Sequence, residues 1–252
     1  MSRTLSPSQL SLFLEDEEQY YLRYVKKRTK DPQTHQMALG SAFDCYVKKE
    51  LAGNDFDEAV QKSVEPQNHE RAVVDGMDAY LKYVESGAFQ ILKRELTGAN
   101  IRCEERQIVE VQGVMLNCIA DLYTDDIILD WKVNGYYSSG RPGKGYKRMM
   151  KDGVDKADVF SHVDSWKEGC SLIEPSWWIG LETYALVHKA KEVWLDQLIF
   201  SNKKLRVAQY RWKFQETGVM DRYRELKERW AKYEATGEFL RDIGRQRILD
   251  LL

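Results

Sequence analysis

The stretch from Val114 to Val133 constrains the fold of this chain more than any other. Apolar and β-branched residues flank a short polar segment around Asp125 and Asp126, a pattern that predicts two antiparallel strands joined by a tight turn. Because side chains alternate between the two faces of a strand, one face of this hairpin is wholly apolar and must be covered by other elements. That face is expected to carry Val114, Leu116, Cys118, Ala120, Leu122, Ile127, Leu129, Trp131 and Val133.

The opposite face of the hairpin carries three charged residues, Asp121, Asp130 and Lys132. The predicted turn places Asp121 directly opposite Asp130, and Ile119 opposite Lys132. Opposed residues have Cβ atoms about 5 Å apart, where like charges are destabilising. A divalent cation held by both carboxylates would offset this repulsion. The alternative is an exposed hairpin edge, in which the acids are solvated and Lys132 forms a weak cross-strand ion pair.

Asp121 followed by the triplet Asp130-Trp131-Lys132 resembles the signature of the PD-(D/E)XK nuclease superfamily, and within it the RecB-like branch with its phage-encoded members. The resemblance implies a Mg²⁺- or Mn²⁺-dependent nuclease of restriction-endonuclease-like fold that acts on DNA. It implies that Asp121 and Asp130 are catalytic metal ligands, with the carbonyl of Trp131 as a further ligand. Lys132 would position the attacking water and stabilise negative charge at phosphorus.

A helix expected from about His35 to Leu51 carries a second point of resemblance. The RecB-like branch has Gly-x-x-x-His in this place, and this chain has Gly40 and Asp44 at that spacing. Residues four apart share a helix face, so Asp44 could replace the histidine as a metal ligand, and Gly40 would let that face approach the sheet closely. A carboxylate there would favour Mg²⁺ over Mn²⁺. The alternative is that Asp44 is a solvated helix residue.

Another helix, expected from about Pro175 to Lys191, carries Tyr184. The RecB-like branch has Gln-x-x-x-Tyr in this place, which implies that Tyr184 contacts the substrate. Gly180 stands where that pattern has glutamine. Glu182 cannot substitute for the glutamine, because a helix residue two positions along points in another direction.

A stretch with little periodicity, about 134–173, follows the hairpin as a long insertion. Loops of this length in compact domains usually have a function or are disordered. The stretch contains a basic segment without acidic residues, which is a candidate for contacts with DNA phosphates. The alternative is a solvated loop that binds nothing. The basic residues of the segment are Arg141, Lys144, Lys147, Arg148 and Lys151.

The order of the expected elements predicts an α/β (α+β) fold with a restriction-endonuclease-like core. A central mixed sheet would contain a three-stranded antiparallel meander flanked by helices. The meander would begin at Ile101, and Glu104 and Glu105 in its first strand are expected to be solvated, although they could approach the site. Residues from about 1 to 97 would be a helical elaboration of a single domain spanning 1–252, because no Pro/Gly/Ser-rich linker divides the chain.

Composition narrows the possible functions. The net charge of −2 gives no global basic field, which argues against a nonspecific DNA coat protein but not against a nuclease with local positive charge. The four cysteines lack paired spacing, so we expect free thiols and no iron–sulfur cluster. The sequence has no apolar run of 18 residues and no signal peptide, which indicates a cytoplasmic protein of a bacterium or a phage-infected host.

Together these features predict a metal-dependent deoxyribonuclease, exonuclease-like and active in DNA recombination, repair or phage DNA processing. The alternative is a catalytically inactive protein of the same fold that binds DNA or a protein partner, such as a recombination or replication protein. The intact set of Asp121, Asp130 and Lys132 favours the enzyme, whereas the replaced histidine and glutamine favour the binding protein. The sequence does not indicate an oligomeric state.

Overall fold

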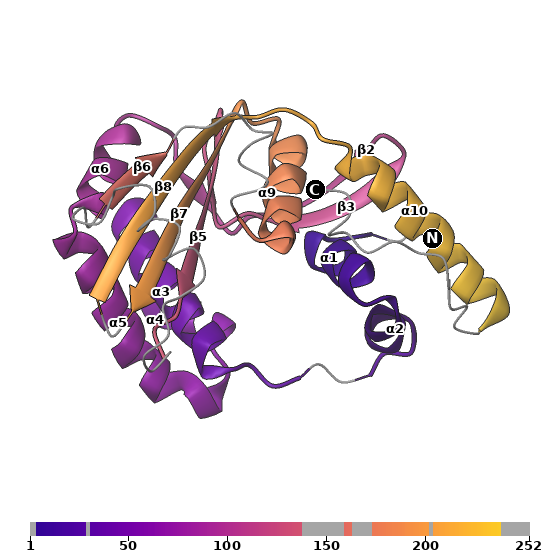
Figure 1. Ribbon diagram of the computed structural model, residues 1–252, viewed down its shortest axis with the longest axis horizontal. Coiled ribbons are helices and arrows are strands. Elements are labelled where there is room, and N and C mark those ends of the chain that lie inside the picture. Colours follow the sequence, from indigo (N-terminus) through magenta and orange to yellow (C-terminus); the bar gives the residue numbers. More distant parts are fainter. Residues whose placement is uncertain (1–3, 29–30, 138–158, 163–172, 202–203, 238–252) are drawn as a thin grey trace.

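The protein is described by a computed structural model that covers residues 4–28, 31–137, 159–162, 173–201 and 204–237. Its centre is a six-stranded sheet with the strand order β1-β4-β5-β7-β8-β6 (Figure 1). Strands β5 and β7 are parallel, as are β6 and β8, whereas the other neighbours are antiparallel. The expected α/β class with a central mixed sheet is therefore confirmed. The strands are β1 (Arg102–Cys103), β4 (Leu122–Tyr123), β5 (Ile127–Asn134), β6 (Val159–His162), β7 (Glu192–Ser201) and β8 (Lys204–Lys213).

The expected meander is divided between two sheets. Strands β2 (Arg106–Val111) and β3 (Val114–Ile119) form a separate antiparallel pair, so the chain leaves the central sheet after β1 and returns to it at Leu122. Ile119 therefore pairs with Arg106, and its predicted position opposite Lys132 is wrong. The predicted register is confirmed where the hairpin persists, since Leu122 pairs with Leu129.

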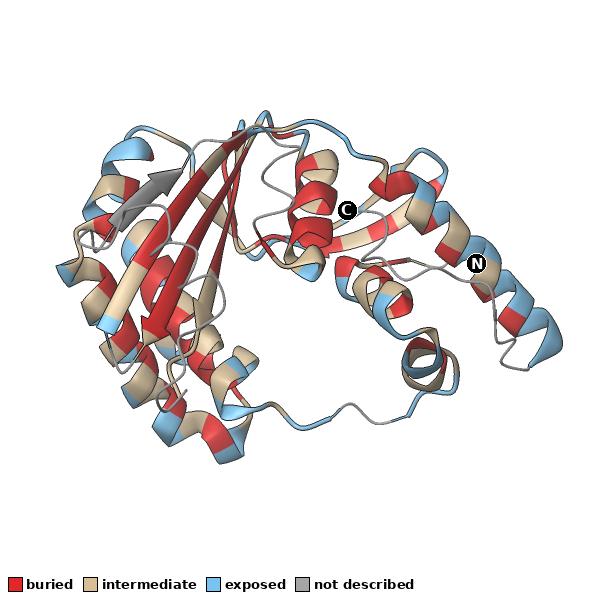
Figure 2. Ribbon diagram, viewed as in Figure 1, coloured by how far each residue is buried: buried red, intermediate tan, exposed pale blue. Residues whose placement is uncertain are grey.

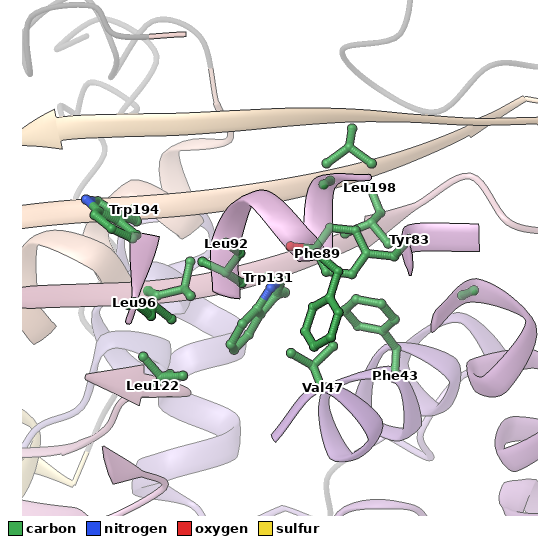
Figure 3. Close-up of a cluster of buried hydrophobic side chains, with 14 of the residues drawn as sticks. Phe43, Val47, Tyr83, Phe89, Leu92, Leu96, Leu122, Trp131, Trp194 and Leu198 are labelled. Atoms are coloured by element: carbon green, nitrogen blue, oxygen red, sulfur yellow. The ribbon is translucent and has the colours of Figure 1, made fainter. Parts of the chain in front are cut away.

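Helices cover both faces of the central sheet (Figure 1). On one face, α3, α5 and α6 contribute Phe43, Tyr83 and Leu92 to a core that also contains Trp131 and Trp194 of the sheet (Figure 3). On the other face, α9 buries its apolar residues against Ile128 and Leu195, among others. The helices of these layers are α3 (His35–Ala52), α4 (Phe56–Ser63), α5 (His69–Glu85), α6 (Ala88–Glu95) and α9 (Pro175–His188), with a 3₁₀ turn η2 at Pro66–Asn68.

The β2–β3 pair belongs to a separate core, which contains side chains of the first and last helices. Figure 2 marks the buried positions of these elements in red. Helix α1 (Pro7–Glu15) begins with a capping box at Ser6. Asp16 then interrupts the helix and caps α2 (Glu17–Tyr20), which continues into a π-helical turn, η1 (Tyr21–Val25). The closing helix α10 (Val219–Thr236) buries an apolar stripe and ends at Gly237, whose φ is +68°.

The insertion expected to lack periodicity contains one described strand. Strand β6 pairs in parallel with β8 at the edge of the central sheet, so residues 159–162 are ordered into the fold. The basic segment with Arg141, Lys144, Lys147 and Arg148 lies outside the described residues. Among the helices that are described, none combines the length and apolar character needed to cross a membrane.

Candidate active site

The candidate site lies along the edge of β5 that β3 leaves uncovered. Strand β4 pairs only two residues with β5, so in the described structure the segment 130–134 has no strand beside it on this edge. Helix α3 runs there instead, and Gln36 donates a hydrogen bond of 2.9 Å from Nε2 to the carbonyl of Val133. The bend at Asp121, between β3 and β4, brings this acid beside the same edge, where it meets Lys48 of α3.

The carbonyl of Trp131 faces the same edge. The Ile127 carbonyl accepts a hydrogen bond from the amide of Thr124, and the Val133 carbonyl accepts one from Gln36, both on the side of β4. Carbonyl directions alternate along a strand, so Trp131, midway in the same series, presents its carbonyl to this side too. The Trp131 side chain is buried in the core on the other side of the sheet, and only its backbone could serve the site.

Asp121 and Asp130 meet as the register predicts. Continuing the Leu122–Leu129 pairing by one residue sets them opposite each other, and their side chains share a hydrogen bond. Burial, and then the charge of Asp121, raise the pKa of Asp130 well above its usual range. Burial alone would also raise the pKa of Asp121, but the Lys48 ammonium and the hydrogen bond with Asp130 hold it below its ordinary value.

Lys132 pairs with its neighbour on the same strand. Its Nζ lies 2.8 Å from Oδ1 and 2.6 Å from Oδ2 of Asp130, because residues two apart point to the same face of β5. The predicted alternative of a solvated edge with a cross-strand pair is therefore wrong in two respects: the Asp130 side chain is only 5% exposed, and the ion pair runs along the strand.

Helix α3 brings Asp44 to this group. Burial, followed by the charge of Asp121, raises the pKa of Asp44 to about 8, while Lys48 and Lys132 act in the opposite direction. Asp44 is thus an electrostatic neighbour of both the Asp121 carboxylate and the Lys132 ammonium. The alternative of a solvated helix residue does not describe it.

Two further residues of the site were not predicted from the sequence. Lys48, one helical turn beyond Asp44, has a side chain only 3% exposed and donates to Glu104 Oε1 at 2.8 Å and Asp121 Oδ1 at 3.4 Å. The positive φ of Glu104, +54°, is a conformation that non-glycine residues rarely adopt, and it accompanies this contact. Glu104 thus approaches the site, as the sequence allowed, while 44% of its side chain stays exposed as expected. The sequence did offer one indication of Lys48: it follows Asp44 by four residues, so it lies on the same side of the helix as Asp44.

The role expected for Gly40 is wrong. A Cβ placed on Gly40 would meet no described atom outside its own helical turn within 4 Å, so no close helix–sheet contact depends on it. Helix α3 does make a close approach to another element, but this element is helix α5 and the glycine at the contact is Gly76. A Cβ there would lie 2.8 Å from the Cβ of Ala42.

Helix α9 presents Tyr184 to the site from the other side. Burial raises the pKa of Tyr184, with smaller contributions from the charges of Asp130 and Asp121, so this residue lies within electrostatic range of the two carboxylates. A Cβ on Gly180 would lie 3.7 Å from the Tyr184 ring, in ordinary contact. Glu182 points away, as predicted, and accepts hydrogen bonds from the backbone and hydroxyl of Thr217 just before α10.

The donors of the site suit a hard divalent cation. Four carboxyl groups, those of Asp44, Glu104, Asp121 and Asp130, face only two ammonium groups, those of Lys48 and Lys132, which leaves two negative charges when all are ionised. Carboxylate oxygens are the ligands that Mg²⁺ prefers. Within the described ranges, however, no three His, Cys, Asp or Glu side chains are gathered as a ready-made metal site. A metal ion would have to draw the carboxylates away from the lysines that now hold them.

Comparison with solved structures finds likeness at low sequence identity. A crystal structure named "putative exonuclease" from Eubacterium rectale matches with a TM-score of 0.50 and 12% identity, covering 98% of this chain and 92% of that one. A phage related exonuclease from Haemophilus somnus matches with a TM-score of 0.34 and 14% identity, covering 89% and 90%. No protein-family model and no curated protein matches the chain. The first likeness shows that this chain shares the fold of that protein over nearly its whole length.

Proposed function

We propose that this protein is a Mg²⁺- or Mn²⁺-dependent nuclease of the PD-(D/E)XK superfamily that hydrolyses phosphodiester bonds in DNA. The observation that carries the proposal is the gathering of four carboxyl groups around two lysines at the open edge of β5, which would leave two negative charges once all of them are ionised. Two opposed carboxylates, Asp121 and Asp130, share a hydrogen bond there although like charges repel. A divalent cation bound by these carboxylates would remove the repulsion between them, and the bound cation could in turn bind a phosphodiester.

The residues have separate roles in this proposal. Asp44, Asp121 and Asp130 would hold the ion, with the Trp131 carbonyl beside them. The bound ion would supply a Lewis acid for the phosphate. Lys132, once its contact with Asp130 is given up, is placed to hold the attacking water and to stabilise negative charge at phosphorus. Tyr184 lies within electrostatic range of the same carboxylates and would contact the substrate.

An exonuclease of DNA recombination, repair or phage DNA processing is the form of activity that we propose. Its support is the fold shared with the Eubacterium rectale protein over nearly the whole of both chains, together with that protein's name. The basic residues Arg141, Lys144, Lys147 and Arg148 would add contacts to DNA phosphates.

A second candidate is a catalytically inactive protein of the same fold that binds DNA or a protein partner. It is favoured by the engagement of Asp121 with Lys48 and of Asp130 with Lys132. Internal ammonium groups of this kind could take the place of a metal permanently.

One assay separates the two candidates. Linear and closed-circular DNA are incubated with the purified protein in Mg²⁺, in Mn²⁺ or in a chelator. Degradation of linear DNA in either metal, and none in the chelator, is the expected result. Cleavage of the circular form would replace the exonuclease with an endonuclease, and DNA binding without cleavage in all conditions would favour the inactive protein.

A further inference from the structure

Gly40 has no packing role that the structure reveals, although it stands inside the 18-residue helix α3. Glycine in a helix interior is less favourable than alanine, because it loses more backbone freedom on folding. No described atom beyond its own turn would obstruct a Cβ at this position. Neither a left-handed conformation nor a close helix crossing therefore explains it.

The open space at Gly40 lies on the site side of α3. Gln36, Gly40, Asp44 and Lys48 follow one another at four-residue steps and so share one helix face. The face is attached to the site region at both ends, through Gln36 to the Val133 carbonyl and through Lys48 to Glu104 and Asp121. Between these attachments a Cβ at position 40 would meet no described atom outside its own helical turn within 4 Å. In the described part of the chain, the helix is therefore anchored on both sides of a position that has room for a Cβ.

The groups around this space suit a phosphodiester. Along β5, Lys132 and the Val133 carbonyl lie between the positions of Asp130 and Asn134, beside the helix face that carries Gly40. Asp44, one turn away, interacts electrostatically with Lys132. A nucleic-acid backbone placed against Gly40 would bring its phosphate toward this ammonium, and a larger residue at position 40 would occupy the room that the backbone needs.

We infer that Gly40 is a substrate-positioning residue, whose missing side chain leaves room for the sugar-phosphate backbone of a DNA strand beside Lys132. The inference rests on the proposed nuclease function and adds to it a place for the strand. A purely structural role for Gly40 would make a larger residue destabilise the protein. The proposed role predicts instead that a larger residue stabilises the helix and obstructs the substrate.

The test compares Gly40→Ala and Gly40→Leu with Gly76→Ala. Alanine and leucine are both strong helix formers, so each Gly40 variant should melt at or above the wild-type temperature, by about 2 °C for alanine. Gly76→Ala is the matched control for a packed glycine, since its Cβ would lie 2.8 Å from that of Ala42. It should melt below the wild type and cleave DNA normally at temperatures where it is folded.

Cleavage kinetics give the second readout. Gly40→Leu should lose at least about tenfold in kcat/KM for linear DNA, with KM raised, while the rise in melting temperature on adding Mg²⁺ stays that of the wild type. Wild-type kinetics in Gly40→Leu would overturn the inference alone, as would a melting temperature lowered as in Gly76→Ala. A loss of the Mg²⁺ response would also overturn it, because Gly40 would then act through the metal. A wild-type protein that cleaves no DNA would overturn the proposed function as well.

Discussion

Lys48 Nζ lies 3.4 Å from Asp121 Oδ1, although 73 positions separate the two residues in the sequence. The same ammonium donates to Glu104, so one buried lysine joins α3 to two acids of the segment that contains β1 and β3. In the absence of metal this contact balances part of the negative charge of the site. It also competes with any cation for Asp121.

Replacing Lys48 by Met should therefore change stability in a metal-dependent way. Without metal, the variant should lose about 2 kcal/mol of unfolding free energy, because Asp121 is left without its counter-ion while Glu104 is partly solvated. Added Mg²⁺ should raise its melting temperature by more than it raises that of the wild type. Lys49→Met, at the exposed next position, is the control and should change neither quantity. Equal Mg²⁺ responses in all three proteins would mean that Lys48 does not compete with metal.

Asp44 predicts a pH dependence of metal binding. Its raised pKa, about 8, means that the carboxyl carries a proton at neutral pH, and a cation can bind to it only when the proton leaves. Apparent Mg²⁺ affinity should thus increase as the pH rises toward 8, by up to about tenfold per pH unit for this group. Asp44→Asn should weaken Mg²⁺ binding and flatten the profile, which calorimetric titration from pH 6 to 9 would measure. An unchanged profile would place Asp44 outside the metal site.

The kind of residue at position 44 should also set the metal preference. Asp44→His introduces imidazole, which suits Mn²⁺ better than Mg²⁺. The ratio of cleavage rates in the two metals should move toward Mn²⁺ in this variant. The same ratio in wild type and variant would contradict a ligand role.

Tyr184 offers a test of the face formed by α9. Tyr184→Phe keeps the ring beside Gly180 and removes only the hydroxyl, whose pKa responds to the charges of Asp130 and Asp121. The melting temperature should change by less than about 3 °C, while kcat/KM for DNA should fall about tenfold if one hydrogen bond to substrate is lost. Full activity would restrict Tyr184 to packing.

The basic segment outside the described residues makes its own prediction. Alanine at Arg141, Lys144 and Lys147 should weaken DNA binding and reduce the salt slope of log K by up to about 3 for duplex DNA, because each phosphate contact contributes about 0.9. Binding measured between 50 and 300 mM NaCl would show the change. A slope identical to that of the wild type indicates the solvated loop, and Arg148 would then also be no phosphate contact.

Contacts between residues close in the sequence could be predicted from the sequence, whereas contacts between residues far apart in it could not. The opposition of Asp121 and Asp130 follows from a short turn, whose geometry fixes the register locally, and the structure has that register. The departure of β3 into a second sheet depends on the core beneath it, where Leu116 and Cys118 pack with α10, and strand alternation alone carries no such information.

Long-range contacts account for what was missed. Lys48 is an ordinary lysine in the sequence, and only the packing of α3 beside the open edge of β5 brings it to Asp121. The two glycines show the same limit. Gly40 and Gly76 are both helix-interior glycines. Among the described residues, a Cβ on Gly40 would meet nothing outside its own turn, whereas a Cβ on Gly76 would meet Ala42 where α3 and α5 cross.

The central claim is that Asp130 and Lys132 act on DNA through a divalent cation, and one set of cleavage rates tests it most directly. Linear DNA is digested by the wild type, Asp130→Asn and Lys132→Ala in Mg²⁺, with Asp125→Asn, an exposed acid of the turn, as the matched control. Both site variants should be at least about a hundredfold slower than the wild type and the control. Asp130→Asn should melt no lower than the wild type, since burial disfavours the Asp130 charge. Cleavage by Asp130→Asn at the wild-type rate would contradict the account.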